Sequence, residues 1–294
     1  MMKRIRTALC LILAAALLAG CAFLPSESEP EALAPADPLT GHPLEWPGQR
    51  PVVVTIENST ASATQWGISS ASVVLEALTE AGMATELCLV YPALAATPKV
   101  GPVAAGQDIY WRLLVGQQPL PVQRGGGQFD QNYLDYYSIR AVDALEAGRT
   151  AFDCGSEWSN APLWYTSGSA VSKVLDALSI SAVLTESRVT SAASAAAASA
   201  SSGSDAVLTV PALLPQEEDG KLPDATAPDA VNVRVCFDDN NATGFAYDPD
   251  SGLYRMLHAG GTPQLDANNG QQAGFDNLLV LFSASELRDD GKTY

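Results

Sequence analysis

The chain has 294 residues, of which 47% are apolar, and 16 Lys and Arg against 33 Asp and Glu give it a net charge of −17. This length fits one or two domains of ordinary composition. Binding to nucleic acid is excluded because phosphate neutralisation needs clustered basic residues, and the same charge disfavours a peripheral hold on anionic lipid heads. With only two histidines, no His-rich metal centre is expected, and no metal or other cofactor is predicted.

The first twenty residues predict a signal peptide. Three basic residues precede an apolar run over 8–19, which is shorter than the roughly 20 residues that a membrane span needs. The run ends in Leu18-Ala19-Gly20-Cys21, which resembles the bacterial lipobox. We therefore expect cleavage before Cys21 and lipid anchoring on the extracytoplasmic face of the cell membrane. Because 1–20 carry three basic and no acidic groups, cleavage takes the net charge from −17 to −20. A short membrane helix with an incidental cysteine is the alternative.

Composition divides the rest of the chain into four parts. Residues 21–48 form the lipid-bearing cysteine and a Pro-rich, disordered tether. Residues 49–185 are predicted to be an α/β domain, 186–229 a flexible Ala/Ser/Pro linker, and 230–294 a smaller β-rich domain. A hairpin turn signal, Asp289-Asp290-Gly291, has no strand behind it, so the β-rich domain is expected to be incomplete.

Apolar patterning places strands and helices in alternation. This order predicts an α/β domain with a mixed sheet and flanking helices, followed by a β-rich domain. In the first domain we expect strands over 52–56, 87–91 and 119–122 and helices over 69–81, 107–115, 129–137 and 169–178. In the second we expect strands over 231–237, 244–247, 253–257 and 278–282.

Three cysteines follow the lipobox, and they are widely spaced. Cys88 lies in an apolar run and is expected in the core, whereas Cys154 and Cys236 adjoin a loop and a strand. One disulfide is possible in principle, but spacing does not identify it. An odd number leaves at least one thiol, which is more often buried than reactive, so no catalytic cysteine is predicted.

Glutamates supply the first candidate ligand-binding residues. Glu76 and Glu80 are four residues apart on the expected helix and would share a face. They could serve as acid/base groups or cation ligands, although a solvated face is the plainer interpretation. Glu57 and Asn58 end the first strand, at the edge where α/β sheets usually bind ligands.

A glycine loop supplies the second candidate. Arg124, Gly125 and Gly126, followed by a third glycine, lie between a strand and a helix, so their amides could cradle an anion. The loop is neither a P-loop nor a dinucleotide fingerprint, and it could equally be a plain turn. The Asp and Asn residues over 238–250 fit turns better than a calcium loop. We find no set of residues arranged for catalysis.

Short motifs in order along the chain resemble the YerB-like family of bacterial lipoproteins, which carry a paired domain of unknown function. The resemblance covers 38–183 and 229–283. It adds Tyr165, Arg255 and Asp266 to the candidate ligand-binding residues. The matching motifs are Asp37–Gly41, Arg50–Val54 with Glu57-Asn58, Gly67-Ile68-Ser69 with Glu76, Val100–Val103, Ala161-Pro162 with Tyr165-Thr166, Tyr254-Arg255 with Gly260 and Asp266, and Asn277–Val280.

The chain departs from the family pattern at polar positions. Relatives carry Arg soon after the Gly-Pro-Val step, where this chain has 104–107 without one. Gln123, Leu163 and Gln264 stand where relatives tend to have His. The resemblance therefore implies a member without these ionisable groups.

We expect a non-catalytic module that binds a small polar ligand or a cell-envelope protein. The alternative is a cell-envelope hydrolase or glycan-active enzyme using Glu57, Glu76 and Glu80. A third possibility is a spacer that presents one surface to a partner.

Overall fold

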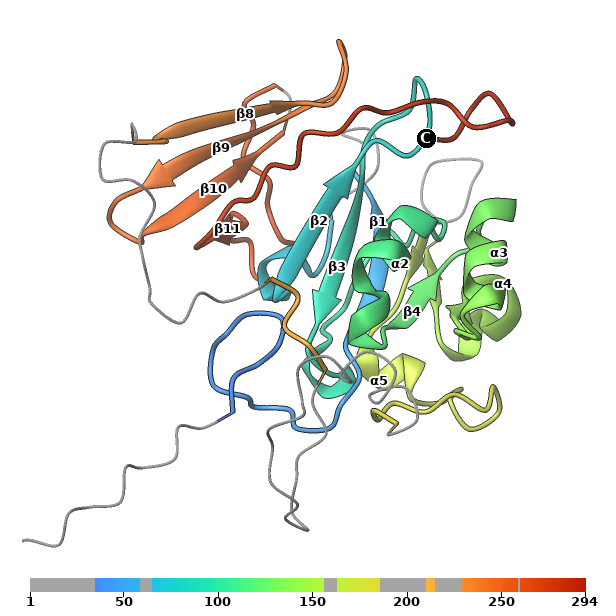
Figure 1. Ribbon diagram of the computed structural model, residues 1–294. Helices are drawn as coiled ribbons and strands as arrows, with labels where there is room; N and C mark the ends of the chain where they lie inside the picture. The colour runs from blue at the N-terminus through green and yellow to red at the C-terminus, as the bar shows by residue number, and fades with distance from the viewer. Residues whose placement is uncertain (1–34, 59–64, 156–162, 186–209, 215–228, 259) are drawn as a thin grey trace, which may run out of the picture. The chain divides into compact units, whose positions relative to one another are not determined.

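Two β-sheets carry the architecture of the computed structural model (Figure 1). The structure describes residues 35–58, 65–155, 163–185, 210–214, 229–258 and 260–294. Residues 36–294 form one compact unit. The expected signal peptide and Cys21 lie outside the described residues, within which no helix has the length and apolarity to cross a membrane.

The first domain is built on a mixed five-stranded sheet of order β2-β3-β1-β4-β5. The central strand β1 pairs antiparallel with β3 and parallel with β4, and β4 pairs parallel with β5. The run Val-Val-Val-Thr-Ile gives β1 the β-branched residues that favour a strand buried on both faces. The strands are β1 (Val52–Glu57), β2 (Val73–Ala77), β3 (Glu86–Tyr91), β4 (Leu120–Gln123) and β5 (Val142–Asp143).

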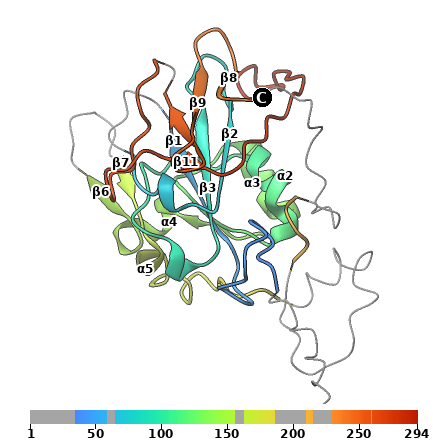
Figure 2. The ribbon, with the colours of Figure 1, turned by 90° about the vertical axis from the view of Figure 1, so that its left-hand side faces the viewer.

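Short helices accompany this sheet. They are α2 (Asp108–Leu114), α3 (Gln128–Tyr136), α4 (Ala144–Ala147) and α5 (Gly168–Val171), with 3₁₀ turns η2 (Ile68–Ser70), η3 (Leu94–Ala96), η4 (Val115–Gln117) and η5 (Gly148–Thr150). A small hairpin joins β6 (Asp153–Gly155) to β7 (Leu163–Tyr165), and Figure 2 shows it at one side of the domain.

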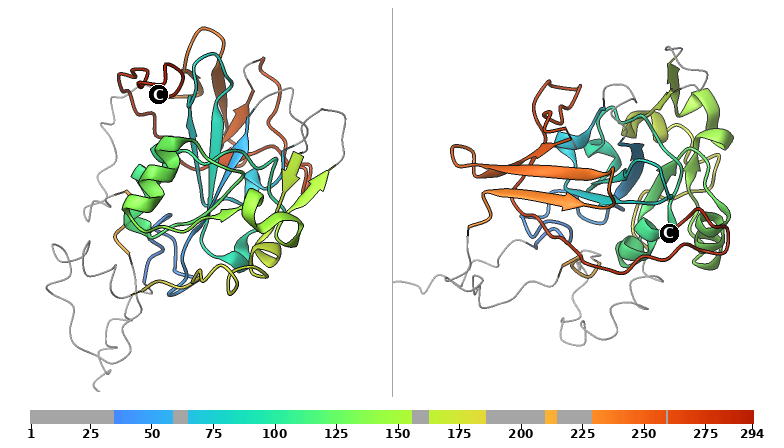
Figure 3. Two further views of the ribbon diagram at one scale, coloured as in Figure 1. Left: turned by 90° about the vertical axis from the view of Figure 1, so that its right-hand side faces the viewer. Right: turned by 90° about the horizontal axis from the view of Figure 1, so that it is seen from above.

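The second domain is an antiparallel four-stranded sheet of order β11-β10-β9-β8. Its longer strands are drawn in orange in Figure 3. Its strands are β8 (Asn232–Cys236), β9 (Ala242–Asp248), β10 (Leu253–Leu257) and β11 (Gly274–Phe275). The predicted fold class, a mixed-sheet domain with flanking helices and a smaller β-rich domain, is therefore confirmed.

The two faces of the first sheet have separate cores. Val53 of β1 and Cys88 of β3 face α2 and α3, where Trp111 is fully buried. The opposite face carries Val54 and also takes in Met256 of the second domain, which is 2% exposed. The two domains therefore share one hydrophobic core, which fixes the second sheet against the first.

The predicted helix over 69–81 is wrong. After η2, residues 73–77 form the edge strand β2, paired with β3. Val73, Leu75 and Ala77 pack toward the α2 side while Val74 packs on the other side, which is the period of two that a strand requires. Ser69 and Ser70 before this segment and Gly82 after it are typical of the ends of a helix, but pairing with β3 outweighs these local signals.

Two other expected elements need correction. The helix expected over 169–178 is the single turn α5, after which residues 172–179 continue as turns. The segment 278–282, expected to be a strand, belongs to none of the three described sheets, although its composition favours a strand. The other predicted strands and helices are confirmed, with ends shifted by a few residues.

The structure describes residues 36–48 of the expected tether and residues 210–214 of the expected linker. Residues 36–48, assigned to the tether, belong to the compact unit, and Asp37 caps a turn by accepting from the backbone N–H of Leu39 at 2.7 Å. Of the linker, the structure describes 210–214, where the N–H of Leu213 donates to the carbonyl of Pro38 at 2.7 Å. The described residues 36–48 and 210–214 thus contact each other within the compact unit.

The structure also places the three cysteines and the predicted turn at Gly291. Cys88 is fully buried, as predicted, and neither it, Cys154 nor Cys236 forms a disulfide with another described residue. The predicted turn at Gly291 is confirmed, since its N–H donates to the carbonyl of Arg288 at 2.8 Å. The residues after this turn pair with the chain just beyond β2, where Thr293 bridges Glu80.

Candidate functional site: a polar cleft at the ends of the parallel strands

The three parallel strands of the first sheet each end in a polar residue. Glu57 ends β1, Gln123 ends β4 and Asp143 ends β5. Because parallel strands have their carboxyl ends at one edge, these residues gather where α/β sheets place ligands.

A cleft of about 700 Å³ opens beside the ends of β4 and β5, against α3 and α4. Four charged side chains, three acidic and one basic, stand on its wall, so the lining carries a net charge of −2 at neutral pH. Arg140 and Glu146 form an exposed ion pair at 3.0 Å. The lining residues are Gln123, Gln131, Leu134, Asp135, Ser138, Ile139, Arg140, Ala141, Asp143, Leu145 and Glu146.

Asp143 fixes the local backbone at the cleft. As the N-cap of α4 it accepts from the N–H of Leu145 at 2.8 Å. The same oxygen accepts from the N–H of Gly125 at 3.0 Å. The glycine loop therefore donates to a carboxylate of its own chain, and the anion cradle expected there already holds this internal carboxylate.

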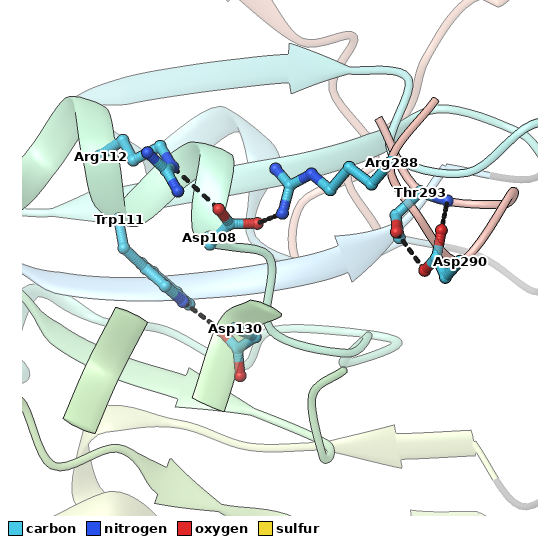
Figure 4. Close-up of polar contacts among 7 residues, drawn as sticks. All are labelled: Asp108, Trp111, Arg112, Asp130, Arg288, Asp290 and Thr293. Atoms are coloured by element: carbon cyan, nitrogen blue, oxygen red, sulfur yellow. Dashed lines mark hydrogen bonds and ion pairs between the residues drawn. The ribbon is translucent and has the colours of Figure 1, made fainter. Parts of the chain in front are cut away.

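A second carboxylate lies beneath the cleft. Asp130 is 2% exposed and accepts from the indole N–H of Trp111 (Figure 4). It also accepts from Nε2 of Gln123 at 3.0 Å. Burial raises the pKa of Asp130; the two hydrogen bonds lower it, and the charges of Asp108 and Asp143 raise it further. This side chain is thus a carboxyl held in an environment that resists its ionisation.

Two positions around Asp130 require glycine because neighbouring side chains lie too close to the backbone there for a Cβ atom. A Cβ on Gly126 would collide with Oδ2 of Asp130, and a Cβ on Gly106 would collide with the amide of Gln123. These two glycines also form a parallel bridge. The Oε1 atom of Gln123 is buried without a hydrogen-bond partner in the described structure.

Glu57 and Arg124, both predicted from the sequence, meet each other. Their side chains are 3.5 Å apart and about one third exposed. The Nε atom of Arg124 is buried and has no hydrogen-bond partner among the described residues. At the end of β1, the Glu57 carbonyl accepts from Nε2 of Gln65 at 2.5 Å.

A glutamate that sequence reasoning missed lies opposite Glu57. Glu86 starts β3 in register with Glu57, so both face the α2 side of the sheet. Burial raises the pKa of Glu86 to about 7, the charges of Glu80 and Glu57 add to this, and hydrogen bonds to Gln107 and Thr79 oppose it. Its Oε2 has no hydrogen-bond partner within the described part of the chain.

Glu76 lies on the opposite face from Glu57. It pairs in register with Leu87 rather than Glu86, and its Oε1 accepts from Asn58 at 3.0 Å and from Thr243 of β9 at 2.6 Å. Burial raises its pKa despite these hydrogen bonds. The charges of Glu57 and Glu80 both act on Glu86, whereas Glu76 lies on the other face of the sheet, so the structure does not gather Glu57, Glu76 and Glu80 into one acid/base set.

Asp266 joins the two domains. It is fully buried and accepts from the N–H of Gly67 at 3.0 Å, and from the N–H and hydroxyl of Ser69 at 2.9 and 2.7 Å. Burial opposes ionisation, but these hydrogen bonds and one from the N–H of Asn268 outweigh it and lower the pKa of Asp266. Two motifs of the family resemblance are therefore two sides of one structural contact.

The last two candidate residues, Tyr165 and Arg255, make contacts away from the cleft. Tyr165 of β7 lies with Trp66 around the ammonium of Lys99, at 4.8 and 3.8 Å from the ring centroids. Arg255 of β10 forms an ion pair with Asp248 at 3.3 Å, on the second sheet. Neither contributes to the lining of the cleft.

Of the cleft's charged residues, sequence reasoning missed all four: Asp135, Arg140, Asp143 and Glu146. A signal existed in the sequence, because Asp143 and Glu146 have the spacing of a helix N-cap and the third residue of that helix.

Within the described residues, no group of three or more His, Cys, Asp or Glu is placed to hold a metal ion.

Comparison with known proteins gives a family and a fold. Residues 39–181 match the family model "Protein of unknown function (DUF3048) N-terminal domain". Residues 232–294 match the model of the DUF3048 C-terminal domain. The crystal structure of the YerB protein from Bacillus subtilis is similar, with a TM-score of 0.62, 21% identity, and coverage of 82% of this chain and 72% of that one. No curated protein matches the sequence.

Proposed function

The chain belongs to the YerB-like family of paired DUF3048 domains, and from that premise we propose that it is a lipid-anchored extracytoplasmic protein that binds a small polar ligand carrying an amine. The ligand would occupy the cleft at the ends of β4 and β5 and would leave unchanged. The observation that carries the proposal is the acidic, open cleft at the strand ends.

The charge of the cleft selects the class of ligand. Asp135, Asp143 and Glu146 outnumber Arg140, and the whole chain carries −17, so the local field attracts cations. Among the described residues no three His, Cys, Asp or Glu side chains are grouped to hold a metal ion, which favours an organic cation as the ligand. An amine donates up to three hydrogen bonds, which the carboxylates and Gln131 of the lining can accept.

Binding without chemistry is supported by what the nearby carboxylates already do. Asp143 holds the glycine loop and the start of α4, and Asp130 accepts from Trp111 and Gln123. No His, Lys or Cys is among the residues that line the cleft. Asp143 and Asp130 therefore have structural roles, which leaves Asp135 and Glu146 of the lining as the main acceptors for an amine.

The first test addresses the anchor. Cells that express the full chain are fed a radiolabelled fatty acid, and the chain is recovered by immunoprecipitation. We expect label on the wild type, which fractionates with membranes, and none on Cys21→Ala. Equal labelling of both chains would overturn the lipid anchor at this cysteine while leaving the cleft proposal standing.

The second test addresses the ligand, with spermidine as the probe. The full chain in mild detergent should show a saturable rise in melting temperature with spermidine, because ligand binding to the native state stabilises it. Inorganic phosphate, as an anion, should give no shift. The spermidine effect should weaken with added salt because exposed charges are screened.

Two variants that change charge in opposite directions serve as matched controls. Glu146→Gln removes one negative charge from the cleft and should weaken spermidine binding about fivefold, whereas Arg140→Gln removes the only lining cation and should strengthen it about as much. The two residues are paired and about equally exposed, so their effects on folding should be alike. Identical behaviour of both variants would contradict binding in this cleft.

A further inference from the structure

The charges that a ligand can reach in the lining of the cleft fall into two groups. Arg140 and Glu146 form the first group, an ion pair with 3.0 Å between Nη2 of Arg140 and Oε1 of Glu146. Asp135 of α3 is the second: its carboxylate accepts from Nε2 of Gln131 at 2.9 Å and forms no ion pair with a described residue. The lining therefore offers a bound molecule a pair of opposite charges and a separate negative charge.

Arg140 keeps donors for a second partner. A guanidinium carries five N–H donors, and one of these, on Nη2, goes to Glu146. The side chain of Arg140 is 53% exposed, so it stays open to a molecule in the cleft. Because the flat guanidinium can bind the two oxygens of a carboxylate at once, Arg140 can hold a carboxylate of the ligand beside Glu146.

The ion pair matches the head group of an amino acid. An α-amino acid carries an ammonium and a carboxylate on one carbon atom, so its two charges can meet Glu146 and Arg140 together, each against its opposite. A plain amine has no group for Arg140, and its positive charge is repelled there. The pair therefore favours a zwitterionic head group over a plain amine.

The lining also contains apolar side chains. Ala141 and Leu145 are among them, and Leu145 is 74% exposed. Methylene groups of a ligand gain free energy by covering such surface. A short aliphatic chain can therefore join a head group at Arg140 and Glu146 to a second charged group at Asp135.

Charge complementarity then identifies the class of ligand. Asp143 already accepts from two backbone N–H groups, so Asp135, Glu146 and Arg140 are the charged groups left for a ligand. Two negative charges and one positive charge call for two ammonium groups and one carboxylate. Building on the amine site of the proposed function, we propose that the cleft binds a diamino acid, an α-amino acid with a second amine at the end of an aliphatic side chain. Arg140 holds its carboxylate, Glu146 its α-ammonium and Asp135 its side-chain ammonium.

Calorimetric titration with L-lysine as the probe tests the three contacts. The full chain is kept in mild detergent at about pH 6, where both amines of lysine are protonated. Three analogues each lack one charge: L-lysinamide lacks the carboxylate, Nα-acetyl-L-lysine the α-ammonium and L-norleucine the side-chain ammonium. Each should bind at least about fivefold more weakly than lysine. Nα-acetyl-L-lysine also stands for the same residue at the end of a peptide, so it distinguishes that source from a free amino acid.

Lysinamide gives the decisive comparison. It carries one more net positive charge than lysine, so attraction to an acidic cleft alone would make it the tighter ligand. Contact with Arg140 reverses this order. In Arg140→Gln, lysine should bind about fivefold more weakly and lose its advantage over lysinamide. Arg149→Gln is the matched control, because it removes the same charge at an exposed position outside the lining, and it should keep the preference for lysine.

A second pair of variants tests the side-chain ammonium. Asp135→Asn should weaken lysine binding about fivefold and leave norleucine binding unchanged, because norleucine has no ammonium at that end. Asp176→Asn changes an exposed aspartate outside the lining and should alter neither affinity.

Three results would overturn the proposal. Lysinamide binding as tightly as lysine to the wild type would exclude the diamino acid and leave the amine site standing. Equal weakening of lysine binding by Arg140→Gln and Arg149→Gln would exclude the carboxylate contact. Failure of the wild type to bind lysine, lysinamide and spermidine alike would overturn the amine site as well.

Discussion

Two buried aspartates, one at the domain junction and one beneath the cleft, have opposite electrostatic surroundings. Asp266 is met by three backbone N–H groups and a hydroxyl, and its pKa is lowered. Asp130 has two side-chain donors and two neighbouring carboxylates, and its pKa is raised. Both are almost fully buried, at 0% and 2% exposure.

The difference separates a contact that stabilises from one that costs free energy. At the junction, folding supplies enough donors to hold the ionised carboxylate and so ties the second domain to η2. Near the strand ends, Glu86 and Asp130 are desolvated without full compensation, and Gln123 and Arg124 keep buried polar atoms without a described partner. Such electrostatic strain gathers at functional sites more often than elsewhere.

The largest effect is expected at the junction. Asp266→Ala leaves the buried N–H of Gly67 and its neighbours without an acceptor and should lower the free energy of unfolding by about 3 kcal/mol. Asp266→Asn keeps the shape but turns an amide toward the N–H of Ser69, so we expect about half of that loss. Urea denaturation of the full chain measures both.

The pH dependence of this loss has a definite sign. Because the pKa of Asp266 is lowered by folding, its stabilisation is complete above the ordinary aspartate pKa of about 3.9 and disappears as the pH falls through the folded-state value. The difference between wild type and Asp266→Asn should therefore be constant above about pH 5 and shrink in stronger acid. A difference that grows in acid would contradict the ionised assignment.

Glu86 should behave in the opposite way. Its pKa of about 7 against an ordinary 4.5 means that the charged form destabilises the fold as the pH rises through this window. Glu86→Gln should therefore stabilise the chain at pH 8, by up to about 3 kcal/mol at about 1.4 kcal/mol per pKa unit, and change little at pH 4. Thermal melts of both chains at the two pH values give the comparison, and destabilisation at pH 8 would show that the ionised carboxylate is well solvated.

The two adjacent glycines of the loop give a steric test of the same region. A methyl group on Gly126 meets the Asp130 carboxylate, so Gly126→Ala should cost about 2 kcal/mol. Gly127 is the matched control, because a Cβ there meets nothing within 4 Å and its φ is −73°. Gly127→Ala should cost under about 1 kcal/mol, the loss expected at a helix N-cap. Equal costs would mean that Asp130 moves freely.

The smallest effect is expected at the C-terminal segment. Arg288 forms an ion pair with Asp108 at 2.8 Å (Figure 4) and its side chain is only 22% exposed. The guanidinium also lies over the ring of Phe129. Asp108 keeps a second partner in Arg112, so Arg288→Ala should cost about 1 kcal/mol. A double-mutant cycle with Asp108→Asn isolates the pair, and a coupling energy near zero would show that the segment is held by its backbone contacts alone.

The sequence was most informative where local signals and tertiary packing agree. The β-branched run of β1 and the turn residues of the second domain predict their strands because each residue type favours the structure that it adopts. The segment 73–77 shows the limit: its fate depends on pairing with β3, which no local window contains. Residues 278–282 show the opposite case: their composition favours a strand, but no described strand pairs with them.

The candidate site was less predictable for a related reason. Glu57 and Arg124 were found because they follow strands, and Asp143 was missed because β5 is only two residues long. The carboxylates of Glu86 and Asp130 acquire raised pKa values from burial and neighbours contributed by distant segments. Asp266 was found by resemblance, but its contact with Gly67 across 199 residues required the structure.

Calorimetric titration of spermidine into the full chain tests the central claim, that the strand-end cleft is a cation-binding site. We expect one saturable site on the wild type, weaker binding by Glu146→Gln and tighter binding by Arg140→Gln, because the lining charge becomes less negative in the first variant and more negative in the second. No heat of binding to the wild type, or affinities that do not respond to these two substitutions, would contradict it.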